Sequence, residues 1–422
     1  MRNAFVIAAI ELLLSLGRAV GQDCEPDWSF GDLAPGTNAP IHALAIYDDG
    51  NGPALFVGGQ FALAGGQPVG NIAKWDGTSW SALVTGVNGP VFGLDVFESQ
   101  LIAVGNFSNA GALTVNRVAA WNGNAWAAFG GGVNATVRAV RVFDGELFIG
   151  GWFTNIGSIA RWDGFNWAPL GQGITGGAFP YVYAFLEYGG VLVVGGSFTQ
   201  VNHSPAMGIA QYDGANLTPY YGWIGGYVYA LATYNGDLIV AGDFISATGT
   251  PANNIARWDG HGWHALGTGT NDSVFALAAI GGRLYAGGSF TTAGGVTAAH
   301  IAYWDGAGWF AIGEGTNDSV RALAVSDSDV FTGGFFTAAN GESSLFISEL
   351  DCPSFAQMPG DMNCDGATDF DDVDRFVLAL LDPPAAALSC PCCSLLRGDL
   401  NASGSVTTAD LQPFVDAILS GI

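Results

Sequence analysis

The residues best suited to chemistry are oxygen-bearing side chains near the C-terminal end of the chain, and they occur twice at one spacing. In 361–372, oxygen donors fall at positions 1, 3, 5, 9 and 12, and Gly366 stands at position 6. Twelve-residue Ca²⁺ loops use this spacing, with a glycine for the sharp turn and a backbone carbonyl at position 7. The pattern returns 38 residues later, in 399–410. We therefore predict two Ca²⁺ sites, formed by Asp361, Asn363, Asp365, the Ala367 carbonyl, Asp369 and Asp372, and by Asp399, Asn401, Ser403, the Ser405 carbonyl, Thr407 and Asp410.

The segments that follow the two loops also match at this offset. Their apolar residues recur every three or four positions, which gives each segment one apolar helical face. We therefore expect two helices that pair through these faces. The corresponding residues are Val373, Phe376, Val377 and Leu380 in the first segment, and Leu411, Phe414, Val415 and Ile418 in the second.

This duplicated loop and helix resembles a type I dockerin, a module with two EF-hand-type loops, over about 60 residues. Dockerins end each loop with Asp, as Asp372 and Asp410 do here. The resemblance implies attachment to a cohesin-like or cell-surface partner. The pairs before the final Asp, Phe370-Asp371 and Thr408-Ala409, differ from the Ser-Thr type with which cellulosomal dockerins engage cohesin.

The stretch Asn363-Cys364-Asp365-Gly366, followed by a later Cys, resembles the form of this loop in secreted proteins of planctomycete-type bacteria. In that form of the module, Cys364 pairs with Cys393, so the resemblance implies a disulfide between them. Cys390 and Cys392 stay unassigned.

A second set of candidate binding residues is aromatic. Tyrosine and tryptophan are concentrated in the region from 179 to 229. A flat aromatic platform suits sugar rings, which have apolar faces and polar edges. We predict ligand contacts from Tyr181, Tyr220, Tyr221, Trp223 and Tyr227. The alternative is that members such as Tyr183 and Tyr229 only pack inside the fold.

Five carboxylates are the candidates for an acid/base pair, as a polysaccharide-cleaving enzyme would need. None of them lies in a catalytic motif, and the chain has no Ser-His-Asp, Cys-His or metalloprotease pattern. We therefore assign no catalytic residue and keep a carbohydrate-active enzyme as the alternative to a binding protein. The candidates are Glu187, Asp243, Asp272, Glu314 and Asp318.

The elements that must position these residues form a repeat. A Gly-x-Phe turn recurs with its Phe at 61, 107, 153, 198, 244, 290 and 336, so that successive gaps are 46, 46, 45, 46, 46 and 46 residues. Each repeat holds four short apolar runs bounded by Gly, Asn or Asp, which is typical of strands joined by turns. Seven copies of a four-stranded unit at a period of about 46 predict an all-β seven-bladed β-propeller, within 22–355.

A Trp-Asp-Gly sequence, or a close variant, ends the third run of six copies, as at Trp258-Asp259-Gly260. Asp-Gly supplies the positive-φ positions of a tight hairpin. The catalytic interpretation, an Asp box like that of sialidase-type propellers, needs the order Asp-x-Gly-x-Thr-Trp, which these turns lack. We predict structural turns.

The seventh copy departs from the pattern where a ring would close. Its third run ends in Glu349-Leu350-Asp351-Cys352, whereas the segment 23–28 resembles the missing half of the hairpin. We predict that the Trp28 segment supplies the outer strand of the last blade and that a Cys24–Cys352 disulfide joins the two sides. The alternative is that 352–355 forms this outer strand itself.

The repeats resemble kelch-type and galactose-oxidase-like propellers, and more closely the Gly-Gly-x-Phe … Trp-Asp-Gly-x-x-Trp repeats of fungal cortical cell-polarity marker proteins. This resemblance implies a fold and little about chemistry. No Cys lies between Cys24 and Cys352, so the copper centre of galactose oxidase, which needs a Cys-linked Tyr, is absent.

Charge and the N-terminal segment suggest where the protein works. The formal charge of −25 argues against nucleic acid and anionic membranes as partners. Residues 1–21 have the basic start, apolar stretch and small final residues of a signal peptide, and no stretch is apolar and long enough for a transmembrane span. With a linker at 356–360 and the module at 361–422, we expect a secreted bacterial, non-catalytic binding protein. Its propeller face would bind a carbohydrate or protein ligand, and its Ca²⁺-dependent module would attach it to a surface or scaffold.

Overall fold

The computed structural model describes residues 26–29, 33–177, 179–280, 282–326, 329–351, 376–377 and 413–414. The expected signal peptide, the linker, both predicted Ca²⁺ loops and all four cysteines of the predicted disulfides lie outside these residues. The chain divides into two compact units, one of which is Trp28–Leu350. The other comprises Met1–Asp27 and Asp351–Ile422.

The larger unit is built of antiparallel β-sheets. Within the described residues, seven sheets contain a path of four strands. In chain order from the innermost strand, the first three sheets are β2 (Ile41–Asp48), β3 (Pro53–Gly59), β6 (Ile72–Trp75) and β7 (Trp80–Ala82); β8 (Val91–Phe97), β9 (Gln100–Gly105), β12 (Val118–Trp121) and β13 (Trp126–Ala128); and β14 (Val137–Phe143), β15 (Glu146–Gly151), β16 (Ile159–Trp162) and β17 (Trp167–Pro169). The next two are β19 (Val182–Tyr188), β20 (Val191–Gly196), β23 (Ile209–Tyr212) and β24 (Leu217–Pro219); and β25 (Ile224–Tyr234), β26 (Asp237–Ala247), β28 (Ile255–Trp258) and β29 (Trp263–Ala265), with β27 (Thr250–Pro251) paired to β26. The last two are β30 (Val274–Ile280), β31 (Arg283–Gly288), β34 (Ile301–Trp304) and β35 (Trp309–Ala311); and β36 (Val320–Ser326), β37 (Asp329–Gly334), β40 (Ile347–Asp351) and β1 (Asp27–Ser29).

Short strands of two residues form in the turns between the second and third strands, and one of them, β18, lies in the loop that precedes the fourth sheet. They are β4 (Leu63–Ala64) with β5 (Gln67–Pro68), β10 (Asn109–Ala110) with β11 (Leu113–Thr114), β21 (Gln200–Val201) with β18 (Ile174–Thr175) and β22 (Ser204–Pro205), β32 (Thr292–Ala293) with β33 (Val296–Thr297), and β38 (Ala338–Ala339) with β39 (Glu342–Ser343). The third sheet differs, because its corresponding segment, 152–158, is described as turns without a strand pair.

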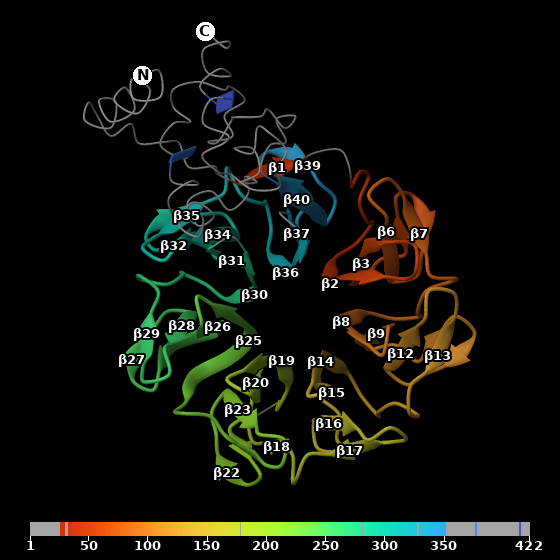
Figure 1. Ribbon diagram of the computed structural model, residues 1–422, viewed down its shortest axis with the longest axis horizontal. Coiled ribbons are helices and arrows are strands. Elements are labelled where there is room, and N and C mark those ends of the chain that lie inside the picture. Colours follow the sequence, from red (N-terminus) through yellow and green to blue (C-terminus); the bar gives the residue numbers. More distant parts are fainter. Residues whose placement is uncertain are drawn as a thin grey trace. The chain divides into compact units, whose positions relative to one another are not determined.

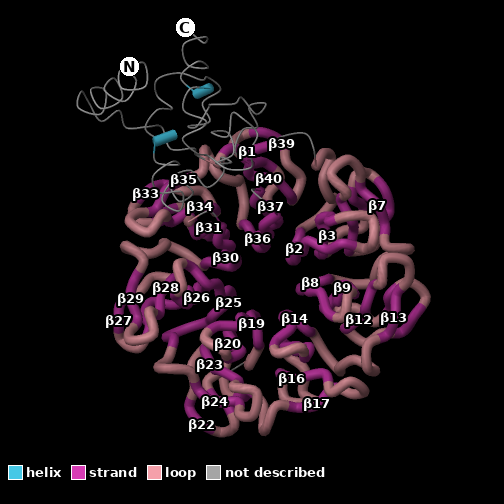
Figure 2. The backbone as a smooth tube through the Cα atoms, in the orientation of Figure 1, coloured by secondary structure: helices cyan, strands magenta, loops and turns pink. Residues whose placement is uncertain are grey.

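The sheets stand around a common centre, as the ribbon and the tube show (Figures 1 and 2). The innermost strands β2, β8, β14, β19, β25, β30 and β36 each contact the next, and β36 contacts β2. The Trp28–Leu350 unit is therefore a closed β-propeller.

Close packing between neighbouring sheets explains the repeated glycines before the Phe. A Cβ on Gly287 of β31 would lie 2.5 Å from Cγ1 of Val320, the first residue of the next innermost strand. Gly58, Gly150, Gly195 and Gly333 face the corresponding Val or Ile in the same way. The Phe that ends the motif fills the space beside them, as Phe290 does with a fully buried ring. The motif therefore encodes contact between sheets.

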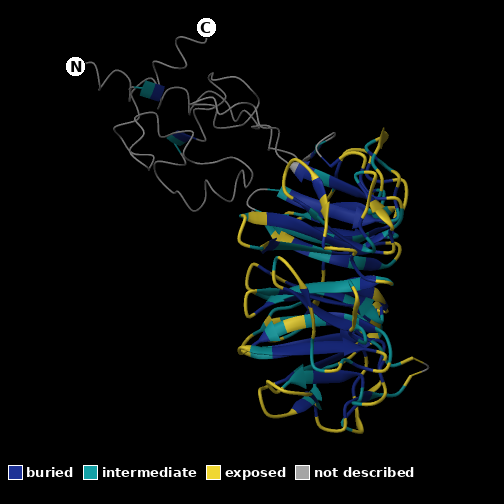
Figure 3. Ribbon diagram, turned by 90° about the vertical axis from the view of Figure 1, so that its right-hand side faces the viewer, coloured by how far each residue is buried: buried dark blue, intermediate teal, exposed yellow. Residues whose placement is uncertain are grey.

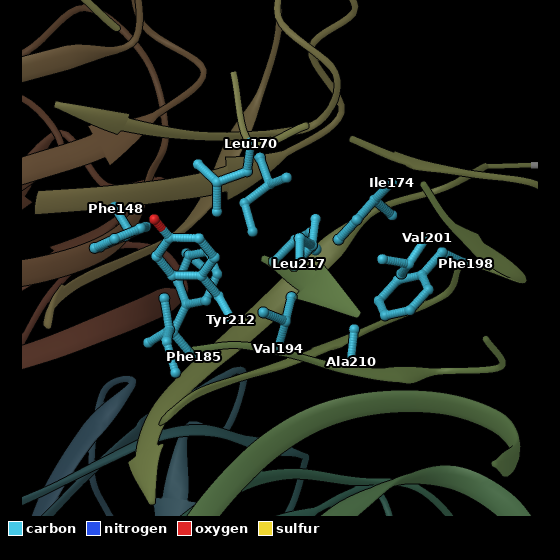
Figure 4. Close-up of a cluster of buried hydrophobic side chains, with 14 of the residues drawn as sticks. Phe148, Leu170, Ile174, Phe185, Val194, Phe198, Val201, Ala210, Tyr212 and Leu217 are labelled. Atoms are coloured by element: carbon cyan, nitrogen blue, oxygen red, sulfur yellow. The ribbon is translucent and has the colours of Figure 1, made fainter. Parts of the chain in front are cut away.

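The core lies between the sheets and not in one central mass. Figure 4 shows one interface, where Phe148 of the third sheet meets Phe185, Val194 and Tyr212 of the fourth. Burial follows the strands, whereas exposed residues gather in the loops at their ends (Figure 3). Each sheet thus stabilises its two neighbours.

The Trp-Asp-Gly segments are turns, as predicted. Asp259 Oδ1 accepts hydrogen bonds from the backbone N–H groups of His261 and Gly262, both at 2.8 Å. The same pair of bonds is made by Asp76, Asn122, Asp163, Asp213 and Asp305. Side-chain caps of this kind need an acceptor and no catalytic function.

The prediction that the Trp28 segment supplies the outer strand of the last sheet is confirmed. In the last sheet β1, from the N-terminal part of the chain, is the outer strand beside β40. Trp28 is buried, and its indole N–H donates to the carbonyl of Ile312 in the preceding sheet at 3.2 Å. The alternative, an outer strand from 352–355, is not what this sheet contains; the Cys24–Cys352 disulfide stays a prediction.

In the smaller unit, Phe376–Val377 and Pro413–Phe414 are described, both as helix. The rings of Phe376 and Phe414 stack with centroids 3.8 Å apart and an interplanar angle of 6°, and both are buried. These two residues correspond at the 38-residue offset, so the expected contact between the two apolar faces is present at this position. Among the described residues, no helix is long and apolar enough to cross a membrane.

Candidate ligand site at the central channel

A β-bulge at the start of each innermost strand turns one side chain out of the regular alternation. In the third sheet Val137 pairs with Gly151 and Ala139 pairs with Gly150, which leaves Arg138 unpaired between them. The other six innermost strands show the same shift of register. A bulge of this kind re-aims the side chain of the extra residue. The residues at these positions are His42, Phe92, Arg138, Tyr183, Tyr229, Phe275 and Arg321.

These seven side chains, which we call the bulge ring, line one cavity of about 300 Å³. The innermost strands surround the centre of the propeller (Figure 1), so the cavity lies in the central channel, near the starts of these strands. The ring combines two guanidinium groups, four aromatic rings and one imidazole.

Each arginine of the ring lies over the phenylalanine of the preceding sheet. The Cζ atom of Arg138 is 4.1 Å from the ring centroid of Phe92, and that of Arg321 is 3.6 Å from the centroid of Phe275. A guanidinium stacked on an aromatic face keeps its N–H groups free in its own plane. Both arginines can therefore donate hydrogen bonds to a group in the channel.

Neither arginine forms an ion pair within the described part of the chain, unlike Lys74, Arg161 and Arg257, which pair with Asp49, Glu146 and Asp237. The Nε atoms of Arg138 and Arg321 are buried and have no hydrogen-bond partner among the described residues. Burial lowers the pKa of Arg321, and the positive charge of Arg138 acts in the same direction, while the Asp318 carboxylate opposes it.

The pKa of His42 shows which residues of the bulge ring carry its charge. Burial lowers the pKa of His42 to about 4, and the charges of Arg138 and Arg321 act in the same direction, against a hydrogen bond with Gln60. The imidazole is therefore neutral at neutral pH, and the positive charge of the ring comes from the two arginines.

A cluster of two exposed aromatic residues, Trp152 and Phe179, and the partly buried Tyr181 adjoins the ring; we call it the aromatic shelf. Trp152 is 40% exposed and Phe179 is 58% exposed. The Trp152 ring lies 5.9 Å from that of Phe179 and 5.6 Å from that of Tyr181. Tyr181 in turn stacks on Tyr183 of the bulge ring at 5.4 Å, with an interplanar angle of 15°. Apolar faces thus continue from the solvent into the channel.

The five aromatics predicted as ligand contacts divide into two groups. Tyr181 belongs to the shelf, and Tyr227, 47% exposed, lies 6.2 Å from Tyr229 of the ring. Tyr220 is buried against Trp258 and Trp263, and Tyr221 stacks flat on Trp258 at 5.8 Å, with the outer strands of the fifth sheet. Trp223 is exposed and exchanges hydrogen bonds with Thr248. The structure therefore brings only Tyr181 and Tyr227 to the channel.

The sequence interpretation missed Trp152 and both arginines. It also offered packing inside the fold as the alternative for Tyr183 and Tyr229, which instead line the cavity and contact each other edge-on at 5.1 Å. The signal that could have identified the ring is the second position of the aligned innermost strands, where every copy carries a bulky aromatic or basic residue.

No hydrogen bond joins two of the candidate carboxylates among the described residues, and the backbone N–H of Glu314 donates to Asn340 Oδ1 at 2.9 Å. Burial lowers the pKa of His300, and the carboxylates of Asp318 and Asp272 both oppose this effect. Asp272 and Asp318 each accept a hydrogen bond from the following backbone N–H, at 2.6 Å. Glu187 is five residues beyond Val182 in β19, whereas Asp243 pairs with Tyr227, one residue before Val228 in the neighbouring β25. The two residues are therefore six positions apart along the strand direction, a separation of about 20 Å. The two carboxyl groups of a glycosidase lie only about 5–10 Å apart. Within the described residues, no group of three or more His, Cys, Asp or Glu could hold a metal ion.

Comparisons with known proteins give the fold but no site. No family model matches this chain, and no curated protein matches it. The extracellular domain of the one-component system BT4673 from B. thetaiotaomicron is similar in structure, with a TM-score of 0.53 and 12% identity over 78% of this chain and 40% of that one. The computationally designed Ika8 protein has a TM-score of 0.46 and 15% identity over 75% of this chain and 97% of that one. The WD40 β-propeller domain of Doa1 has a TM-score of 0.46 and 12% identity over 75% of this chain and 93% of that one. At 12% identity the likeness to the BT4673 domain concerns the fold alone, so any function has to be inferred from the channel itself.

Proposed function

We propose that this chain is a secreted, non-catalytic binding protein that holds a carbohydrate at the mouth of its central channel. In this proposal each four-stranded sheet is one blade of a seven-bladed propeller of the kelch type. A dockerin-like module with two Ca²⁺ sites attaches the propeller to a surface or scaffold. The observation that carries the proposal is the aromatic shelf and its continuity with the bulge ring.

The shelf supports a sugar ligand because of the shape and chemistry of its surface. Trp152, Phe179 and Tyr181 present aromatic faces next to one another, and two of the three are strongly exposed. Sugar rings offer apolar C–H faces to such surfaces and keep their hydroxyl groups for polar partners. The hydroxyl groups of Tyr181 and Tyr183 and the guanidinium of Arg138 supply polar partners beside the shelf.

Binding without catalysis is favoured by the positions of the carboxylates. Asp272 and Asp318 each accept a hydrogen bond from the following backbone N–H, and Glu187 and Asp243 lie about 20 Å apart along the strand direction. A glycosidase would need two carboxyl groups facing one bond.

The attachment module is supported by its donor set and by one contact. The two loops supply oxygen donors of the kind and spacing that Ca²⁺ prefers. The stacked pair Phe376 and Phe414 joins equivalent positions of the two halves. Ca²⁺ would supply the charge that holds the loop carboxylates together; it takes no part in the events at the channel.

The test is binding of oligosaccharides to the full chain by calorimetry, with a parallel assay for released reducing sugar. We expect Trp152→Ala to weaken binding about tenfold, because an aromatic contact contributes ~1–1.5 kcal/mol. Tyr221→Ala removes an exposed aromatic ring from the outer strands and serves as the matched control, with unchanged affinity.

Sugar release would favour the enzyme alternative. A chain that binds no oligosaccharide, or that binds equally well with Ala at position 152, would refute the proposed site. Capture of a protein ligand instead, competed by no glycan, would refute the carbohydrate specificity.

A further inference from the structure

We infer that the glycan carries an anionic group, a carboxylate of a uronic acid or a sulfate ester, and that Arg138 and Arg321 bind this group in the bulge ring. The inference rests on the proposed function and specifies the substrate class of the same site.

The first argument is the distribution of charge. The chain has 37 Asp and Glu residues and only 12 Lys and Arg residues. Two of these few cations nevertheless stand in one cavity, without an ion pair in the described part of the chain. A partly buried guanidinium without an anionic partner is costly, and a bound anion would remove that cost. In so acidic a protein, the unpaired arginines indicate that the partner is supplied by the ligand.

The second argument is the geometry of the two guanidinium groups. Phe92 and Phe275 support their faces at 4.1 and 3.6 Å, which fixes the planes in which the N–H groups point. The ring centroid of Phe335 lies 5.1 Å from the Cζ atom of Arg321 and is a second aromatic neighbour. The buried Nε atoms of both arginines lack a partner among the described residues. An arginine held in this way presents a fork that matches the two oxygens of a carboxylate or a sulfate.

The third argument links the anion to the sugar. Arg138 lies 5.9 Å from the ring of Tyr181, which belongs to both the shelf and the path into the channel. A sugar ring on the shelf would therefore place a substituent toward the Arg138 guanidinium. A free inorganic anion would use the arginines but not the shelf, so the combination specifies an anionic sugar.

The positive potential comes from the arginines and not from the histidine. The pKa of His42, about 4, leaves its imidazole neutral, and its Nε2 is buried without a partner among the described residues. Removing one arginine should therefore remove a large part of the attraction for the anion.

The experiment compares three probes on the full chain by calorimetry: an oligogalacturonate, a sulfated galactan oligosaccharide and neutral cellohexaose. We expect at least one anionic probe to bind at least tenfold more tightly than cellohexaose, with an affinity that falls as salt rises. Arg138→Gln and Arg321→Gln should each weaken that binding by about tenfold or more. Arg138→Lys should recover part of the loss, since it keeps the charge but not the fork. The oligogalacturonate and galactan arms decide between carboxylate and sulfate.

Arg257→Gln is the matched control, because Arg257 pairs with Asp237 in the second and third strands of the fifth sheet and not in the ring. It should leave the affinity unchanged. The salt dependence of the unaltered protein tests the inference even where an Arg variant does not fold.

Two failures are distinguishable. If neutral and anionic probes bind equally, with no salt dependence and no effect of the Arg variants, the inference is wrong and the carbohydrate site stands. If no probe binds at all, both the inference and the proposed function are wrong. Equal binding of inorganic sulfate, with no gain from the sugar, would also overturn the inference.

Discussion

At the residue scale, the repeated aspartate after the third strand shows how a side chain that looks catalytic can be purely structural. Its carboxylate accepts two backbone hydrogen bonds in each turn, and at position 122 an asparagine makes the same pair of bonds. An amide can replace a carboxylate as a hydrogen-bond acceptor but cannot act as a general acid or base. The exchange within one chain therefore argues that the turn needs an acceptor only.

The carboxylate should nevertheless make the stability of the propeller depend on pH. Backbone hydrogen bonds from Gly262 and His261, with a contribution from His264, lower the pKa of Asp259 to about 2 from an ordinary value of 3.8. A lowered pKa stabilises the fold above the ordinary value and loses this contribution as pH falls through the lowered one. We expect Asp259→Asn to keep the turn, as Asn122 does, and to remove the part of the pH dependence that comes from Asp259.

The measurement is urea unfolding of both proteins at several pH values between 5 and 2. The stability advantage of the unaltered protein over the Asn variant should be largest near pH 5 and should shrink toward pH 2. A difference that is constant with pH, or that grows on acidification, would contradict the assigned cause.

At the element scale, the sequence predicted most of what the strands do. Three features of the sequence reflect what each strand or turn needs locally: the period of the Gly-x-Phe turns, the four apolar runs in each copy and the Asp-Gly hairpins. They predicted four-stranded antiparallel sheets, and these sheets are present. A Gly such as Gly287 is required because the neighbouring sheet leaves no room for a Cβ.

The bulge ring could not be predicted from the same rules. Alternation in a regular strand assigns every second side chain to one face, and on that basis Tyr183 and Tyr229 were equally compatible with packing inside the fold. The extra residue of each bulge breaks this alternation by one position. Whether a strand bulges depends on its partner and on the curvature of the sheet, which a single strand sequence does not state. The separation of Tyr221 from Tyr181 likewise depends on their places in the loops between sheets, because Tyr221 follows the outer strand β24 closely whereas Tyr181 directly precedes the innermost strand β19.

The contact between sheets can be tested through its glycine. Gly287→Ala would place a Cβ against Val320 and should destabilise the propeller by about 1–3 kcal/mol, the range for overpacking. Shortening the partner in Gly287→Ala/Val320→Ala should make the double variant more stable than the sum of the two single changes, because the residues share one space.

The double-mutant cycle is measured by chemical denaturation. Gly308→Ala is the matched control, since its new Cβ would meet only Phe310, at 3.7 Å, and should change stability by about 0.5 kcal/mol or less. Additive effects at Gly287 and Val320 would show that the glycine has another role.

At the scale of the whole molecule, a ring of sheets makes the ends of the propeller segment interdependent. The last sheet takes its outer strand, β1, from the beginning of the segment, and Trp28 fills the position that Trp309 fills in the sheet before it. Each donates its indole N–H to a carbonyl of the preceding sheet, at 3.2 Å from Trp28 and 2.9 Å from Trp309. The closure thus reuses a contact that Trp80, Trp126, Trp167, Trp263 and Trp309 also make, whereas the fourth sheet has Leu217 at this position. It turns a linear repeat into a cooperative ring.

The second unit should depend on calcium in a way that the propeller does not. The first loop proposed in 361–372 carries four aspartates at ligand positions and the second, in 399–410, carries two. Without a cation these carboxylates repel one another, and a module of about 60 residues buries too little apolar surface to oppose the repulsion easily. Binding of Ca²⁺ should therefore contribute to the folding free energy of this unit, by ~2.7 kcal/mol for a site at a Ca²⁺ concentration a hundredfold above its Kd.

We expect scanning calorimetry of the full chain to show one transition that chelator shifts to lower temperature and one, from the propeller, that chelator leaves in place. Titration should count two Ca²⁺ ions, and Asp361→Ala should abolish the tighter of the two sites while preserving the transition of the propeller. A chain that takes up no Ca²⁺, or whose transitions are all unaffected by chelator, would refute the proposed module. A chelator that shifts only the propeller transition would show that the metal binds to the propeller, which would also refute it.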